Sequence, residues 1–106
     1  MSEPHFYEQI ESVAKAFADA KKDNKVTWEE AAGVVYKMLQ AGIHAWRALD
    51  SDDGHFDRLV TDTELVFDRY IVPLDFPLND FLERIAERFM RLQIRPSLQR
   101  LRELLD

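Results

Sequence analysis

Apolar side chains recur at three- and four-residue spacing along most of this 106-residue chain, and this periodicity constrains the fold more than any other feature. Such spacing places the apolar residues of a segment on one face of a helix. The chain has only three Gly and four Pro, which leaves little room for long loops or a many-stranded sheet. The sequence therefore predicts an all-α fold, a single compact bundle of about five helices in one domain spanning residues 1–106.

Breaks in this periodicity give the expected helix boundaries. The polar run from Lys21 to Lys25 and the acidic run from Asp50 to Gly54 are typical of turns. A proline at position 96 is suited to the first turn of a helix. We expect helices over about 5–19, from 28 for about twenty residues, over about 62–71 and about 79–93, and from about 95 to the end.

One short phrase occurs twice, as Val26-Thr27-Trp28-Glu29-Glu30 and Val60-Thr61-Asp62-Thr63-Glu64. A Thr followed three residues later by Glu is a capping box, in which each side chain bonds to the backbone amide of the other residue. The preceding Val is suited to a hydrophobic staple with Ala31 in the first copy and Leu65 in the second. We therefore predict that each copy marks the beginning of a helix.

The same segments resemble two degenerate EF-hand loops, over 19–30 and 53–64, in a helix–loop–helix pair covering roughly residues 5–71. The resemblance implies a divalent-ion-binding protein, whose candidate ligands would be Asp19, Asp23, Thr27, Glu30, Asp53, Asp57, Thr61 and Glu64. It also implies that the loops could pair as a minimal two-strand bridge between 25–27 and 59–61. Two residues depart from the pattern: Lys21 occupies a ligand position, and Arg58 replaces the glycine of the loop. These departures favour the capping boxes over ion binding.

Composition bounds the class of protein. The formal net charge is −6, whereas a general nucleic-acid binder has a dominant basic surface. There is no cysteine, which excludes disulfides and cysteine-ligated zinc. Neither a signal peptide nor a run long enough to span a membrane is recognisable, so we expect a cytoplasmic protein without a membrane partner. No cofactor is predicted, and a small-molecule ligand remains open.

Catalytic patterns are weak. The acidic group Asp52, His55 and Asp57 could hold a divalent ion, but an ordinary acidic loop explains it better, because no second His or alternating Asp pattern lies nearby at ligand spacing. No Ser/His/Asp order, phosphate-binding loop or paired carboxylates stand out. We therefore expect that the protein is not an enzyme.

Two features indicate protein contacts. The proline-bracketed segment 71–78 is apolar and would present Val72, Leu74 and Phe76 either to the helix bundle, as a lid, or to a partner. An arginine row follows on the next helix, opposite its apolar stripe: Arg84, Arg88, Arg91 and Arg95. These arginines are either solvated or grip an acidic surface. The sequence thus predicts a non-enzymatic protein–protein interaction or structural module, which binds another protein or itself.

Overall fold

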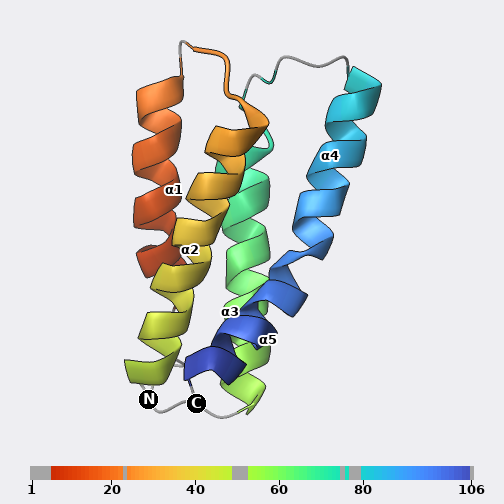
Figure 1. Ribbon diagram of the computed structural model, residues 1–106. Coiled ribbons are helices and arrows are strands. Elements are labelled where there is room, and N and C mark those ends of the chain that lie inside the picture. Colours follow the sequence, from red (N-terminus) through yellow and green to blue (C-terminus); the bar gives the residue numbers. More distant parts are fainter. Residues whose placement is uncertain (1–5, 23, 49–52, 75, 77–79, 106) are drawn as a thin grey trace.

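The computed structural model describes residues 6–22, 24–48, 53–74, 76 and 80–105. Its elements are α1 (Tyr7–Lys21), α2 (Trp28–Ala48), α3 (Asp53–Val66), the π-helix η1 (Phe67–Ile71), α4 (Asp80–Leu92) and α5 (Ile94–Leu105). Helices α1 to α4 run in alternating directions, α5 continues in the general direction of α4, and α1 begins at the end of the molecule where α5 finishes (Figure 1). The described residues include no strand, in agreement with the predicted all-α class.

The core lies between α1, α2 and α3, and Ile94 and Leu98 of α5 are buried in it as well. From α1, Ile10 and Ala14 are buried, and they face the long stripe of α2. At Gly42 the two helices and α3 come close together: a Cβ added there would lie 2.7 Å from Leu59 Cδ1 and 3.2 Å from Ile10 Cδ1. The side of α2 that carries Gly33 is open, with nothing within 4 Å of an added Cβ.

The first copy of the repeated phrase is a capping box, as predicted. The Glu30 amide donates to Thr27 Oγ1 over 3.1 Å, and the Thr27 amide donates to Glu30 Oε1 over 3.1 Å. Val26 and Ala31, the two staple residues, are both buried. Lys21 forms an ion pair with Glu30, and this contact, together with the Thr27 amide, lowers the pKa of Glu30. The box therefore marks the beginning of α2.

The second copy lies inside α3, so the predicted helix beginning at about 62 is wrong. α3 begins nine residues earlier, at Asp53. Thr61 Oγ1 donates to the backbone carbonyl of Asp57, one turn back in the same helix, over 3.0 Å. The two-strand bridge is likewise not formed, because residues 59–61 are helical.

Burial explains why the helix continues through this sequence. Phe56 and Leu59 are buried ahead of the phrase, Val60 is buried at its first position, and Val66 and Phe67 are buried after it. This spacing keeps one helical face on the core for more than three turns. The apolar face thus overrides the local capping signal.

Asp62, in the middle of the phrase, is itself buried and holds the chain before α1. It accepts a bond from the Phe6 amide over 3.3 Å, and its carboxylate lies 3.4 Å from Arg58 Nε. Its role in the structure is to satisfy a buried amide that lies far away in the sequence.

In the described part of the chain, the helical residues form four segments when α4 and α5, separated by Gln93 alone, are taken together, so the expected count of about five is not confirmed. η1 continues α3, with the wide turn closed by the Val72 amide on the Phe67 carbonyl over 3.1 Å. α5 follows α4 after Gln93 alone, whose amide is shared between the Phe89 and Met90 carbonyls. Pro96 is tolerated as the third residue of α5, because its missing amide is one that the first turn leaves unbonded anyway.

Candidate protein-binding surface on α4

α4 turns its apolar side to solvent. Five side chains of this side, which we call the α4 face, are 45–71% exposed: Phe81, Leu82, Ile85, Phe89 and Leu92. In an ordinary bundle such a stripe would cover the core, as the stripe of α2 does here. An apolar patch of this size on one helix is typical of an interaction site.

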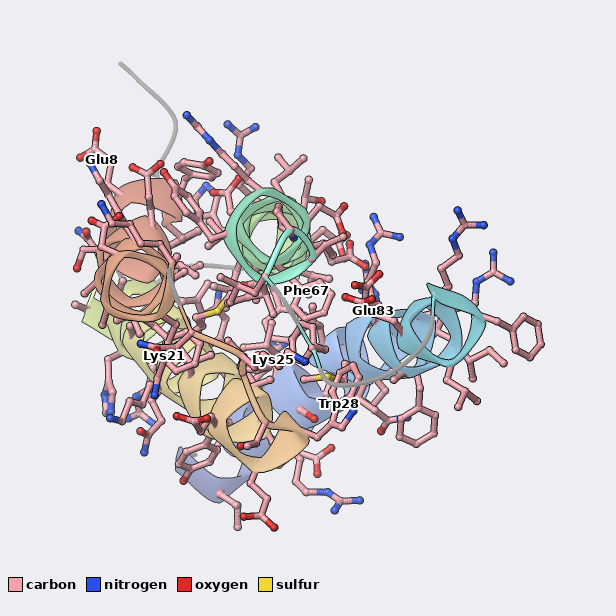
Figure 2. All side chains as sticks on the ribbon, turned by 90° about the horizontal axis from the view of Figure 1, so that it is seen from above. Glu8, Lys21, Lys25, Trp28, Phe67 and Glu83 are labelled. Carbon is pink, nitrogen blue, oxygen red and sulfur yellow. The ribbon has the colours of Figure 1, made fainter. Side chains whose placement is uncertain are left out.

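The acidic side of α4 faces the bundle instead. Glu83 and Glu87 are half-buried, and Figure 2 shows Glu83 on the side of α4 that faces α3 and η1. Partial burial raises the pKa of Glu87, and the neighbouring Glu83 carboxylate raises it further. Carboxylates on the inner side and phenylalanines on the outer side make α4 inverted relative to the other helices.

Only one edge of the α4 face approaches the core. Met90 is half-buried and packs against the core cluster, and Ala86 is half-buried one turn earlier. Between this edge and the first turns of α2 lies a shallow groove of about 530 Å³, lined by Trp28, Ala32, Leu82, Ile85, Ala86, Phe89 and Met90. The groove extends the apolar surface of α4 onto α2.

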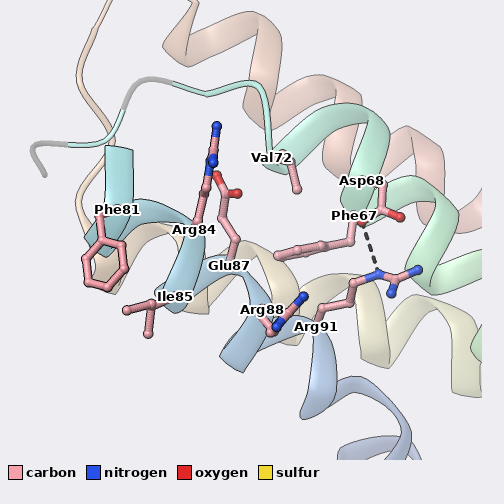
Figure 3. Close-up of a pocket in the computed structure, with 9 residues that line it drawn as sticks. All are labelled: Phe67, Asp68, Val72, Phe81, Arg84, Ile85, Glu87, Arg88 and Arg91. Carbon is pink, nitrogen blue, oxygen red and sulfur yellow. Dashed lines mark ion pairs between the residues drawn. The ribbon is translucent and has the colours of Figure 1, made fainter. Parts of the chain in front are cut away.

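On its other edge, α4 is separated from η1 by an open cleft of about 720 Å³. Phe67, from the core, forms one wall together with Val72 and Asp68, and Arg84, Arg88 and Arg91 line the opposite wall. Phe81, Ile85 and Glu87 also line the cleft, and Figure 3 shows Phe81 and Ile85 directed away from Phe67 and Val72.

Arg84 and Arg88 border the α4 face, whereas Arg95 belongs to α5, so the predicted row opposite the apolar stripe of one helix is wrong. At about 100° per residue, Arg88 lies about 60° and Arg84 about 100° around the helix from Ile85, while Glu83 and Glu87 lie about 160° away. The acids, therefore, are the residues opposite the stripe.

The two ends of the row differ in their partners. Arg91 Nε lies 3.2 Å from Asp68 Oδ1 (Figure 3), and Arg95 Nη1 lies 3.0 Å from Asp57 Oδ1. Both pairs are solvent-exposed and contribute about 0–1 kcal/mol each. Arg84 and Arg88 are exposed and form no ion pair with any described residue.

The other predicted protein-binding residues belong largely to the core. Phe76 is 3% exposed and stacks on Trp28, with ring centroids 4.2 Å apart and planes 10° apart. Val72 and Leu74 are half-buried and pack against the same core. The described part of segment 71–78 therefore covers the bundle, which was the alternative left open by the sequence, and Phe76 is not carried into a binding surface.

The residues implied by the EF-hand resemblance do not form two loops. Residues 53–64 are helical throughout, and Asp57 is paired with Arg95. In the first segment Asp19 is exposed in α1, Thr27 and Glu30 bind each other, and Asp23 lies outside the described residues. On α3, Thr61 donates to the Asp57 carbonyl, and Glu64, three residues further along the helix, is half-buried. Across the described ranges no group of three or more His, Asp or Glu side chains is placed to hold a metal ion.

The acidic group around His55 is also dispersed. His55 and Asp57 are two residues apart in α3, so their side chains leave the helix in different directions, and Asp52 lies outside the described residues. His55 and Asp57 therefore do not share a face of α3.

Comparison of the chain with protein-family models, with curated proteins and with solved structures finds no match. Among the helices that the structure describes, none combines the length and the apolar character needed to cross a membrane.

Proposed function

We propose that this protein is a non-enzymatic interaction module whose docking surface is the α4 face. The observation that supports the proposal is the inverted orientation of α4: its phenylalanines are exposed while its glutamates are half-buried against the bundle. When a helix leaves its apolar side in water, a partner that covers this side gains the free energy of removing apolar surface from water.

The free energy available from covering the α4 face is modest. The five residues of the α4 face are on average about 60% exposed. At about 1.5–3 kcal/mol for full burial of each such side chain, covering them would contribute about 4–9 kcal/mol, and a partner with an equal apolar face would double this to about 9–18 kcal/mol. Association itself costs about 4–15 kcal/mol. The middle values of these ranges leave a surplus of about 4 kcal/mol, so we expect a weak, reversible complex.

The proposal is tested with two double variants that remove equally exposed apolar residues from different places. Ile85→Ser/Phe89→Ser alters the α4 face, and Tyr36→Ser/Leu65→Ser, the control, alters residues on α2 and α3 that are 52% exposed. Each tagged protein is recovered from the cells that encode it, and the co-purifying proteins are quantified. We expect the α4 variant alone to lose a partner. Identical sets of partners from all three proteins would contradict the proposal.

Circular dichroism and thermal unfolding accompany this comparison. Because the substituted residues are exposed, all three proteins should be equally helical and should melt within a few degrees of one another. Loss of a partner without loss of the fold would then be attributable to the surface.

A further inference from the structure

We infer that the partner of the α4 face is an amphipathic helix with carboxylates along one edge of its apolar side. This inference rests on the proposed function and adds the chemistry of the occupant. It follows from the shape of the α4 face and from the charges on its two borders.

The shape of the surface suits a helix. The α4 face follows one side of a helix of 13 residues, and the groove against Trp28 and Ala32 widens it in the direction of α2. Residues 82, 85, 89 and 92 have alternating spacings of three and four, the arrangement through which two helices interlock their side chains. An apolar helix laid along α4 would cover all five residues of the face.

The borders are unlike each other. On the side of α2 the border consists of small or uncharged residues, Ala86 and Gln93. On the cleft side it consists of Arg84 and Arg88, which form no ion pair with a described residue, although the Arg84 charge acts against the rise in the pKa of Glu87 in the same cleft. Arginine binds carboxylates through two parallel hydrogen bonds, so acidic side chains on the matching edge of a partner would be complementary to this border.

A second copy of the chain does not supply this edge. In an antiparallel pair of α4 helices related by a two-fold axis, equal edges adjoin, so the arginines of one copy would lie beside those of the other and repel them. In a parallel pair, the arginine edge would meet Ala86 and Gln93, which carry no charge. The glutamates of α4 lie on the side of the helix opposite the α4 face, with Glu87 in the cleft, so they do not reach the α4 face of the other copy in either arrangement.

A lipid surface also fits less well. A helix that lies on an anionic membrane carries basic residues over its polar side. The polar side of α4 holds Glu83 and Glu87, and the chain as a whole has a formal net charge of −6. Charge therefore favours an acidic protein helix.

The test uses a display library of 18-residue peptides. One helical face is held as Leu or Ile at alternating three- and four-residue spacing, and the flanking positions vary among Glu, Lys, Gln and Ser. The full-length protein is the bait, and binders of the Ile85→Ser/Phe89→Ser variant are removed. We expect the remaining peptides to be enriched in Glu along one edge.

A representative peptide is then titrated by fluorescence anisotropy. Arg84→Gln/Arg88→Gln should weaken its binding at least tenfold in 50 mM NaCl, and the loss should shrink in 500 mM NaCl because salt screens the charges. The control, Lys22→Gln/Arg100→Gln, removes two exposed charges elsewhere and should change the affinity less than twofold. A peptide with Gln in place of each Glu should bind wild-type protein as weakly as the original peptide binds the arginine variant.

The outcomes are distinguishable. Peptides that need Ile85 and Phe89 but are not acidic, or that are indifferent to Arg84 and Arg88, would overturn the inference and leave the proposed function intact. Absence of any peptide that depends on the α4 face would contradict the proposed function as well. A dimer in sedimentation equilibrium, or flotation with phosphatidylserine vesicles, that Ile85→Ser/Phe89→Ser abolishes would replace the acidic helix by a second copy or by a lipid surface.

Discussion

Truncating two phenylalanines to alanine tests the orientation of α4 directly. Phe67 and Phe89 undergo the same chemical change in opposite surroundings: Phe67 is 1% exposed in the core, and Phe89 is 63% exposed on the α4 face. We expect Phe67→Ala to be strongly destabilising and Phe89→Ala to be nearly neutral.

The magnitudes follow from burial. Removing a fully buried Phe side chain loses its transfer free energy and leaves a cavity, which together cost about 3–5 kcal/mol. Phe89 keeps about a third of its surface from water, so the lost transfer term is about 0.5–1 kcal/mol, and the higher helix propensity of Ala recovers roughly half a kcal/mol. The two variants should thus differ by about 3–4 kcal/mol in the free energy of unfolding.

Urea denaturation measures this difference. The fluorescence of Trp28 and Trp46 reports on the core, and circular dichroism reports on the helices. With a slope of about 1.5–2 kcal/mol/M, Phe67→Ala should lower the midpoint by about 2 M and Phe89→Ala by less than about 0.4 M. The slopes of the variants should equal that of the wild type, so that midpoints can be compared.

A cost above about 2 kcal/mol for Phe89→Ala would refute the reasoning, because the α4 face would then be covered in solution. A concentration series would identify the cover. A cost that grows with protein concentration would indicate self-association, whereas a constant cost would indicate that α4 rotates its apolar side onto its own bundle.

Three further predictions concern stability. Thr27→Ala removes the capping box of α2 and should cost about 1 kcal/mol, whereas Thr61→Ala, in the same phrase but within α3, should change the free energy of unfolding by less than about 0.5 kcal/mol. Gly33→Ala, in open space, should stabilise the protein by about 0.5–1 kcal/mol, and Gly42→Ala should be at least about 1 kcal/mol less stable than Gly33→Ala, because its Cβ would press on buried Leu59 and Ile10. Folding raises the pKa of Glu87, so its ionised form opposes folding at pH values above that pKa. Glu87→Gln should therefore raise the melting temperature at pH 7. This gain should disappear as the pH falls to about 3, where the carboxyl group is protonated.

Each of these has a clear contrary result. Equal losses for the two threonine variants would mean that the second phrase also caps a helix. An alanine at position 42 that stabilises as much as one at position 33 would show that α1 and α3 yield without cost. A gain for Glu87→Gln that persists unchanged at low pH would exclude ionisation of Glu87 as its cause.

Local signals in the sequence predicted the helices that begin where the chain turns. The capping box at Thr27 and Glu30 predicted the beginning of α2, and the structure confirms it because the preceding residues, 25–27, are not helical. The second box failed because a capping box is only an option for the backbone. Burial of Phe56, Leu59 and Val60 makes continued helix the more favourable state.

What the sequence determined by itself is which residues of each helix share a face, because the helical period depends only on the backbone. What covers that face was decided only by the tertiary structure. The stripes of α2 and α4 have the same kind of pattern, yet one is buried against α1 and α3 and the other is exposed. The hydrophobic effect has no direction, so burial of an apolar stripe is favourable whichever apolar surface packs against it. For α4, the described residues of this chain do not supply that surface.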